Sequence, residues 1–443
     1  MNESWTVPLR FSCADARAEY RPAALLSLPM RRLDYRLVPA EGYHTPSARA
    51  LQRRLKGRVV LAPQVGLVDG YRLQAVIDRV IVLVVTARKT SWNGVQSAFE
   101  VATGKRIFVD DRNNPAGNIR WRGISMNDAR LVGEHGGGHV FAMQIQDPAP
   151  EMLCKGFDAI ERAYGFAEPV RLFLLEVSLD FYGKAEDEPE LMELRERMVG
   201  LLQRHHHITG WQFESAESDA RQVVRNHSHP GSETTTKYLF GTRGQAEREH
   251  PDSFVGEKEV VRRIGRSQPE SRLFLDATLY KGCDAEDLQI RVQNKVGDSR
   301  RASGFMTLPE TERRARIEVQ VSGDMLTGEK GYEFLKNGRP EFRQLGEEFL
   351  RFWLPTVPEV RNKRRPWLDH FRNTGVYGVE QYRYMCQFNM THPTAAAGGF
   401  SDNARAGRGR TGQLVAWAAM NKRVGEALVK LTNTWEGFSW PGT

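Results

Sequence analysis

Residues 169–181 read PVRLFLLEVSLDF, and this stretch indicates which kind of sheet the chain builds. Side chains alternate between the two faces of a strand, so Glu176 and Asp180 point to the same face, and Leu175, Val177 and Leu179 point to the other. Two carboxylates on a largely apolar strand are costly to bury unless they are solvated, paired or bound to a metal ion. The segment therefore predicts a strand with one core face, and it leaves open whether the acidic face is wet or holds a ligand.

Further strand-like segments surround this one. They are IDRVIVLVVTARKT at 77–90, TTTKYLFGT at 234–242, SRLFLDATLYKG at 271–282, DLQIRVQNK at 287–295 and RRARIEVQVSG at 313–323. Helical periodicity occurs at 152–164 and 188–206, and a helix from 92 to 103 is expected with Ser91 as its cap and Gly104 as its stop. Strands and helices that do not alternate regularly predict an α+β fold with a central antiparallel sheet flanked by helices.

The chain has 443 residues, which allows several domains. We expect an N-terminal extension at 1–75, an α+β catalytic core at 76–330, and a basic, mainly helical DNA-binding region at 331–443. Within these regions, the charged segment 244–266 is predicted to be an insertion loop or an exposed helix. The segment PTVPEVRNKRRP at 355–366 is predicted to be a linker.

The net charge of +8 is unevenly distributed along the chain. Residues 351–443 contain 13 of the 63 lysines and arginines but 6 of the 55 acidic residues, which gives this part a net charge of +7. A local excess of this kind favours a nucleic-acid partner, and an ordinary basic surface is the alternative. The cationic residues we assign to DNA in this region are Arg361, Lys363, Arg364, Arg365, Arg408 and Arg410.

Neither a long apolar run nor a secretory signal is found in the sequence, so we expect no membrane partner. The four cysteines are far apart, which makes a disulfide scaffold or a CxxC metal site improbable. A reducing, cytoplasmic location is the expectation that follows.

A second strand repeats the pattern of the first. In RIEVQV, Arg316 and Glu318 share one face while the isoleucine and valines share the other. If this strand lies beside the first, Glu176, Asp180 and Glu318 would form a three-carboxylate site suited to Mg²⁺ or Mn²⁺. An ordinary alternating strand is the simpler interpretation.

Two tyrosines are candidate nucleophiles. Tyr280 lies in TLYKG beside Lys281, and Arg291 and Lys295 follow on the next predicted strand. Nearby positive charge favours the phenolate form of a tyrosine. Tyr238 lies in a similar setting, TTTKYLFGTRG, and is the rival candidate. A packed tyrosine in a hairpin is the commoner fate of either residue.

The order of these segments resembles the trans-acting replication initiators of rolling-circle plasmids and filamentous phages (the Rep_trans type). The segments that carry the resemblance are LLEVSLD at 174–180, TLYKG at 278–282, RVQNK at 291–295 and RIEVQV at 316–321. The sequence departs from the family pattern at Leu174, at Cys283, and at the Gln293-Asn294 pair.

The resemblance implies a replication initiator that nicks and rejoins one DNA strand at an origin. It implies that Tyr280 attacks the scissile phosphate with the help of Mg²⁺ or Mn²⁺, and that Lys281, Arg291, Lys295 and Arg316 hold phosphates. A host helicase is implied as a partner, and a homodimer is left open. A non-catalytic DNA-binding regulator on the same fold and a metal-dependent nuclease without a covalent intermediate remain the alternatives.

Overall fold

The structure is a computed structural model of the chain. It describes residues 3–9, 31–40, 55–111, 138–208, 222–226, 235–240, 259–264, 273, 275, 277–281, 288–300, 304–323, 326, 342–391, 414–439 and 441. Arg408 and Arg410 lie outside these residues.

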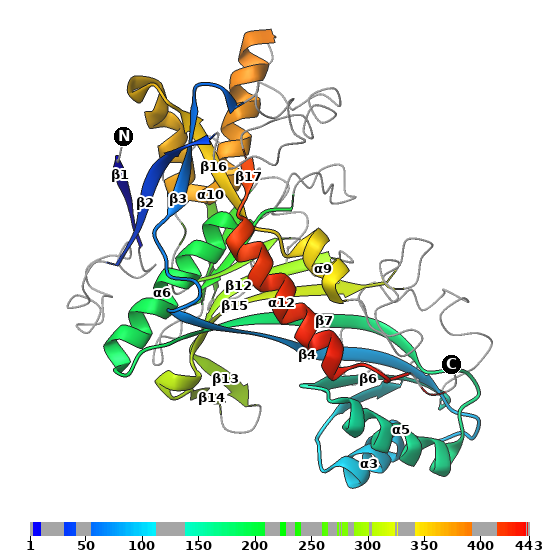
Figure 1. Ribbon diagram of the computed structural model, residues 1–443. Helices are drawn as coiled ribbons and strands as arrows, with labels where there is room; N and C mark the ends of the chain where they lie inside the picture. The colour runs from blue at the N-terminus through cyan, green and yellow to red at the C-terminus, as the bar shows by residue number, and fades with distance from the viewer. Residues whose placement is uncertain are drawn as a thin grey trace.

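A ten-stranded sheet forms the centre of the molecule, in the order β10-β9-β8-β11-β12-β15-β7-β4-β6-β5 (Figure 1). All neighbours run antiparallel except β9 and β10, which are parallel. The strands are β4 (Tyr71–Val85), β5 (Phe108–Asp111), β6 (Val140–Gln146), β7 (Arg171–Gly183), β8 (Gln222–Asn226), β9 (Thr235–Phe240), β10 (Glu259–Ile264), β11 (Ala277–Lys281), β12 (Leu288–Lys295) and β15 (Arg314–Ser322). The α+β class predicted from the sequence is confirmed.

Helices cover this sheet at several places. Helix α6 (Glu188–His205) packs on β7, β12 and β15, and α12 (Ala418–Thr434) packs on β4 and on the short helix α9 (Phe342–Phe349) (Figure 1). Helices α3 (Trp92–Thr103) and α5 (Pro150–Tyr164) pack against each other near β5. A short hairpin, β13 (Gly297–Arg300) with β14 (Gly304–Thr307), and the turn η5 (Glu310–Glu312) lead into β15.

The predicted ends of α3 are confirmed. The side chain of Ser91 accepts a hydrogen bond from the backbone N–H of Gly94 at 3.2 Å, which satisfies a helix donor that would otherwise lack a partner. Gly104 follows the last turn with a φ of 67°, a left-handed conformation that glycine adopts without strain. Both boundaries are therefore set by local sequence.

A second sheet joins the two ends of the chain. Its order is β1-β2-β3-β16-β17, and its strands are β1 (Ser4–Pro8), β2 (Arg32–Pro39), β3 (Arg58–Pro63), β16 (Trp353–Pro358) and β17 (Leu414–Ala416). Strand β16 pairs with β3, so the expected N-terminal extension and C-terminal region share one sheet. The three-part division at residues 75 and 330 does not separate them.

Two local predictions are wrong. The expected linker at 355–366 instead contains the end of β16 and the start of α10 (Arg361–Thr391), which kinks at Gly375. The charged segment at 244–266 contains β10, whose β-branched residues pair with β9 despite the surrounding charge. In the parts of the chain that the structure describes, no helix is both long and apolar enough to cross a membrane.

The end of α6 is tied to the second sheet through buried histidines. His205 donates from Nδ1 to the carbonyl oxygen of Trp353 at 2.8 Å, and its Nε2 lies 3.1 Å from the hydroxyl of Tyr35. Burial lowers the pKa of His205 to about 3, and the nearby Arg204 adds to the effect while the Trp353 contact opposes it. The imidazole is therefore neutral in the folded protein.

This histidine makes stability depend on pH. The unfolded chain binds a proton on the imidazole near pH ~6.5, whereas the folded protein does so only near pH 3. Stability is therefore lost as the pH falls below ~6.5, by about 2–3 kcal/mol at pH ~4.5 from this group. Urea titrations at neutral and acid pH should show a smaller loss for His205→Gln than for the parent. Equal losses in the two proteins would contradict the assignment.

Candidate active site on the polar face of the sheet

On one face of the central sheet, polar and charged residues lie opposite one another on neighbouring strands. Strand pairing sets Asp180 opposite Arg316, Ser178 opposite Glu318 and Glu176 opposite Gln320. We call this side of β4, β7, β12 and β15 the polar face. Its members include Asp78, Arg79, Glu176, Ser178, Asp180, Arg291, Gln293, Lys295, Arg314, Arg316, Glu318 and Gln320.

The other face is apolar and covered by helix α6. Val177, Leu179 and Ile317 are fully buried there. Arg195 of α6 donates to Asn294 at 2.8 Å, and Asn294 lies opposite Ala315 in the apolar rows. The alternation in the sequence thus correctly predicts the two faces of β7 and β15.

A bulge in β4 brings two consecutive residues to the polar face. The pairing with β7 shifts between Ile77 and Arg79, which leaves Asp78 as the extra residue. Asp78 and Arg79 both contact polar-face residues: Arg316 reaches Asp78 at 2.5 Å, and Arg79 reaches Glu176 at 2.5 Å. Sequence reasoning missed Asp78, because strict alternation cannot place a residue at a bulge. The signal available in the sequence was the charged pair Asp78-Arg79, which interrupts the otherwise apolar residues of β4.

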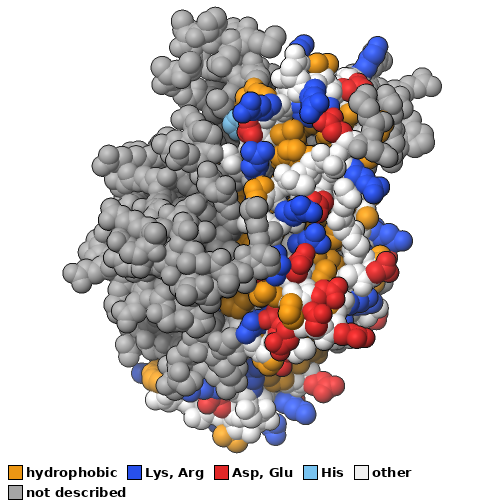
Figure 2. Space-filling model, turned by 90° about the vertical axis from the view of Figure 1, so that its left-hand side faces the viewer, with side chains coloured by type: hydrophobic (Ala, Val, Ile, Leu, Met, Phe, Trp, Pro, Cys, Tyr) orange, Lys and Arg blue, Asp and Glu red, His pale blue; other side chains and the backbone are white. Residues whose placement is uncertain are grey.

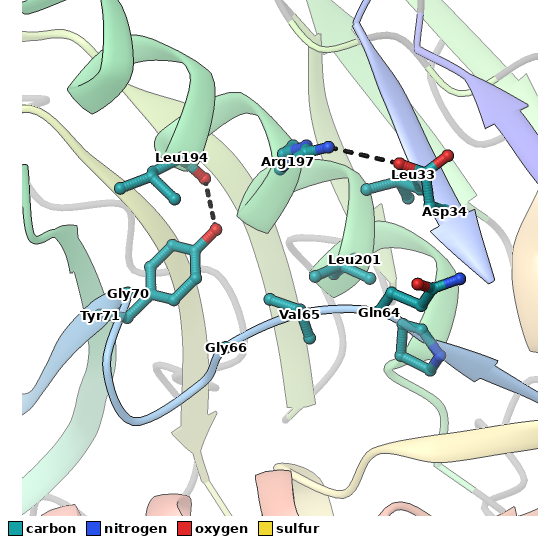
Figure 3. Close-up of a pocket in the computed structure, with 11 residues that line it drawn as sticks. Leu33, Asp34, Gln64, Val65, Gly66, Gly70, Tyr71, Leu194, Arg197 and Leu201 are labelled. Carbon is teal, nitrogen blue, oxygen red and sulfur yellow. Dashed lines mark hydrogen bonds and ion pairs between the residues drawn. The ribbon is translucent and has the colours of Figure 1, made fainter. Parts of the chain in front are cut away.

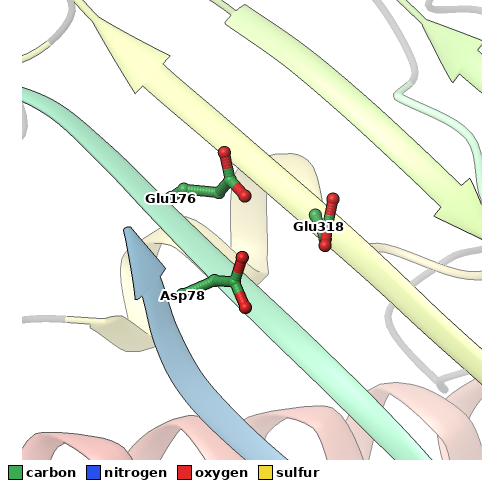
Figure 4. Close-up of side chains that lie close together, drawn as sticks. All are labelled: Asp78, Glu176 and Glu318. Atoms are coloured by element: carbon green, nitrogen blue, oxygen red, sulfur yellow. The ribbon is translucent and has the colours of Figure 1, made fainter. Parts of the chain in front are cut away.

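The carboxylates that converge are Asp78, Glu176 and Glu318. Their oxygen atoms lie within 4.8 Å of one another, and the three side chains point together from β4, β7 and β15 (Figure 4). We call them the acid triad. Glu176 and Glu318 were both predicted as metal ligands, and Asp78 takes the place that was predicted for Asp180.

Asp180 does not belong to the acid triad. Arg316 binds it through two parallel contacts, Nε to Oδ1 at 2.5 Å and Nη2 to Oδ2 at 2.7 Å. Arg314 adds a third contact at 3.0 Å. The bidentate pairing also removes Arg316, whose side chain is 3% exposed, from the set of residues that can reach a phosphate. These two assignments are corrected: Asp180 and Arg316 form a buried ion pair.

Guanidinium groups occupy the oxygens of the acid triad. Arg79 and Arg291 each bind one oxygen of Glu176 at 2.5 Å, and Arg291 also lies 2.6 Å from Glu318 Oε2. Gln293 donates to the other oxygen of Glu318 at 2.8 Å. The four carboxylates on the polar face are thus matched by four arginines, namely Arg79, Arg291, Arg314 and Arg316.

Burial and pairing act on the acid triad in opposite directions. Burial raises the pKa of Glu318, and the neighbouring Glu176 adds to this while Arg291 opposes it. For Asp78, burial also works to raise the pKa, but the contacts with Arg316 outweigh it and the pKa is lowered. Glu318 is therefore more easily protonated than Asp78.

The donor set fits a hard divalent cation. Three carboxylates supply the oxygen ligands that Mg²⁺ and Mn²⁺ prefer. One buried oxygen nearby, Ser178 Oγ, lies opposite Glu318 in the pairing and has no hydrogen-bond partner among the described residues. A buried hydroxyl without a protein partner is consistent with a ligand that is not a protein group.

Strand pairing separates the two candidate tyrosines. Tyr280 of β11 lies opposite Arg291, which lies opposite Glu318, which in turn lies opposite Ser178. Tyr280 thus belongs to the cross-strand row that runs into the acid triad. Since directly opposed residues of antiparallel strands share a face, the register assigns position 280 to the polar face.

Tyr238 belongs to a different row. It pairs with Val224, which pairs with Leu279, and Leu279 pairs with Val292. Leu279 and Val292 are buried core residues of the apolar face. Lys281 also pairs into an apolar row, opposite Ile290, so the phosphate role expected for it does not match its register.

The basic cluster at the start of α10 is divided by burial. The side chains of Arg361 and Arg365 are 91% and 89% exposed, and Lys363 is exposed as well. Arg364 is buried, donates to the carbonyl oxygen of Pro358 at 3.0 Å and pairs with Glu3 at 2.8 Å. Arg364 is therefore corrected from a DNA contact to an anchor of α10. Elsewhere, Figure 2 shows basic and acidic side chains interspersed over the described part of one face.

A pocket lies apart from the polar face, between β2, the segment 63–71 and α6 (Figure 3). The hydroxyl of Tyr71 donates to the carbonyl oxygen of Leu194 at 2.9 Å, and Arg197 lies 3.4 Å from Asp34. None of the predicted site residues lines this pocket. The pocket contains neither a member of the acid triad nor one of its arginines, so it is not part of the candidate site.

Comparison with known proteins adds little. No family model matches the chain, and no curated protein matches it. Among solved structures, aspartate kinase from Synechocystis aligns over 77% of this chain and 60% of its own length, with 9% sequence identity and a TM-score of 0.14. The chain thus spans less than two thirds of that protein, and a likeness at this level carries no argument.

Proposed function

We propose that the protein is a replication initiator that nicks and rejoins one DNA strand through Tyr280. The observation that carries the proposal is the sheet order β11-β12-β15-β7, because these four neighbours are the segments that resemble the rolling-circle initiators. Strand β7 is distant in sequence from the other three, and all four meet in one sheet. Their order sets Tyr280, Arg291 and Glu318 in one row.

The residues of this face have distinct tasks in the proposal. The oxygen of Tyr280 attacks the scissile phosphorus and the bond to the 3′ oxygen breaks, so the 5′ phosphate remains on the tyrosine. The phenolic proton passes to water and the departing 3′ oxygen takes one up. Reversal of this step rejoins the strand, because the phosphotyrosyl bond conserves the energy of the phosphodiester.

Asp78, Glu176 and Glu318 are the residues that would hold Mg²⁺ or Mn²⁺. Such an ion, when bound, neutralises charge that develops on the phosphate. Arg291 and Lys295 lie on the polar face and provide cations for the DNA backbone. The resemblance also implies a host helicase, which would open the duplex beyond the nick.

A denaturing gel tests the proposal. The full chain is incubated with single-stranded DNA and Mn²⁺, and the products are separated under conditions that unfold the protein. A protein–DNA adduct that survives denaturation is the expected result. Free cleavage products would instead support a nuclease without a covalent step. A gel that shows neither an adduct nor cleavage products would support a DNA-binding regulator. One observation favours that alternative: every carboxylate of the acid triad is already paired with an arginine.

DNA affinity should depend on the exposed cations of α10. Replacing Arg361, Lys363 and Arg365 by glutamine should weaken binding and flatten the slope of log K against log salt by up to about three, since roughly one counterion is released per neutralised phosphate. Fluorescence anisotropy at several salt concentrations measures the slope. Arg343→Gln, which removes another exposed arginine, is the control and should leave the slope unchanged. A slope unaffected by the triple substitution would place the DNA surface elsewhere.

A further inference from the structure

The arginines around the acid triad are of two kinds. Arg316 is 3% exposed and fixed by two contacts with Asp180. Arg79 and Arg291 have side chains that are 22% and 23% exposed, and they reach Glu176 from outside. Only these two can leave the acid triad without breaking the buried pair. We call them the outer arginines.

The outer arginines and a cation need the same atoms. Arg79 and Arg291 together occupy both oxygens of Glu176, and Arg291 also lies against Glu318 Oε2. Four arginines and Lys295 face four carboxylates on the polar face, so its net formal charge is positive and it does not attract a divalent cation. Since guanidinium and metal ion compete for the same oxygens, cation entry requires the outer arginines to move.

A phosphodiester offers the outer arginines another partner. Guanidinium groups bind phosphate through two parallel hydrogen bonds, at least as well as they bind carboxylate. The Nε of Arg79 is buried and has no hydrogen-bond partner among the described residues, so one donor of this group is unused. Arg291 lies directly opposite Tyr280. If the proposed function holds, the scissile phosphate sits beside Tyr280 and therefore close to Arg291.

We propose that Arg79 and Arg291 form a phosphate-binding pair that closes the acid triad in the free protein and opens it when DNA binds. The inference rests on the proposed function for the identity of the ligand. A phosphodiester draws both guanidinium groups away from Glu176 and Glu318, and the freed carboxylates then accept the cation. DNA and cation therefore bind with positive coupling, and each raises the affinity of the other by the same factor.

Mn²⁺ binding tests this directly, with the electron paramagnetic resonance signal of free Mn²⁺ as the readout. The full chain carrying Tyr280→Phe is titrated alone and with a short single-stranded oligonucleotide, which stays intact without the nucleophile. We expect the protein alone to bind Mn²⁺ weakly and to bind it about tenfold more tightly when the oligonucleotide is present. Tight Mn²⁺ binding without DNA would overturn the inference and leave the proposed function standing.

Substitutions assign the coupling to the outer arginines. Arg79→Met with Arg291→Met should bind Mn²⁺ tightly without DNA, and the oligonucleotide should no longer change the affinity. The single Arg79→Gln should show a partial effect, and it serves if the double variant does not fold. Arg314→Met is the matched control, because Arg314 contacts Asp180 outside the acid triad, and it should retain the coupling. Coupling that persists in the double variant would refute the role of this pair.

A further control separates failure of the inference from failure of the metal site. Glu318→Gln removes one carboxylate of the acid triad and should abolish the tight Mn²⁺ binding seen with DNA. If the parent and Glu318→Gln bind Mn²⁺ equally weakly with and without the oligonucleotide, both the inference and the metal part of the proposed function are wrong. The adduct assay then decides separately whether Tyr280 acts without a metal.

Discussion

Tyr280→Phe should abolish the protein–DNA adduct, whereas Tyr238→Phe should leave it intact. The substitution keeps the aromatic ring and removes the oxygen that would attack phosphorus. Tyr280 lies opposite Arg291 in the row that leads to Glu318, and Tyr238 belongs to a row of core leucine and valine residues. We expect no adduct with Tyr280→Phe and the full amount of adduct with Tyr238→Phe, because no other nucleophile is expected in the row that contains Tyr280.

The comparison is made on denaturing gels with labelled single-stranded DNA and Mn²⁺. Circular dichroism and DNA binding should be unchanged in both variants, which shows that only the covalent step is affected. An adduct that disappears in Tyr238→Phe and persists in Tyr280→Phe would mean that the pairing of β8 with β9 and β11 does not report the reactive face. An adduct present in both would remove tyrosine chemistry at either position.

Arg316→Met should destabilise the protein by about 3–5 kcal/mol. The substitution leaves Asp180 and Asp78 without their shared guanidinium. Asp180, which is 2% exposed, would keep only its contact with Arg314, so a poorly compensated charge would remain in the sheet. Asp180 loses the partner that makes two of its three ion contacts. Chemical denaturation measures the change in the free energy of unfolding.

Arg343→Met is the matched control for this loss. Arg343 pairs with Glu347 on an exposed helix surface, with side chains 72% and 55% exposed, and such pairs contribute less than about 0.5 kcal/mol. Equal stability of the two variants would contradict the buried ion pair. A loss for Arg316→Met that is rescued by adding Asp180→Asn would support it further, because the pair would then be neutralised on both sides.

Alternation along single strands is the part of this fold that the sequence predicts well. The polar residues of β7 (Glu176, Ser178 and Asp180) and of β15 (Arg316, Glu318 and Gln320) lie at every second position, so their common face follows from strand geometry alone. The ends of α3 were equally predictable, since a serine cap and a left-handed glycine act locally. These features require no knowledge of which strands are neighbours.

The third carboxylate and its arginines were not predictable in the same way. Asp78 reaches the acid triad only because β4 has a bulge beside β7, and a bulge depends on the pairing of two distant strands. The sequence contains many arginines, and nothing in it indicates that Arg316 binds Asp180 while Arg291 binds Glu176. Such choices are made by tertiary contacts.

Strand β16 shows how turn residues can mislead. Its segment begins and ends near proline, and Pro355 and Pro358 favoured a linker. Pro358 stands at the end of the strand, where a missing N–H costs little, and Pro355 pairs with the short strand β17. The pairing partner of β16 on its other side, β3, lies near the opposite end of the sequence, which no local pattern could reveal.

The sheet that joins β3 to β16 sets a timetable for synthesis of the protein. Residue 353, where β16 begins, is made about 290 residues after β3 ends at Pro63. At translation rates of roughly 5–20 residues per second, β3 waits roughly 15–60 s with one edge unpaired. An open strand edge is a template for pairing with other chains, so the nascent protein is most prone to aggregate during this interval. Premature termination before residue 353 would make that exposure permanent.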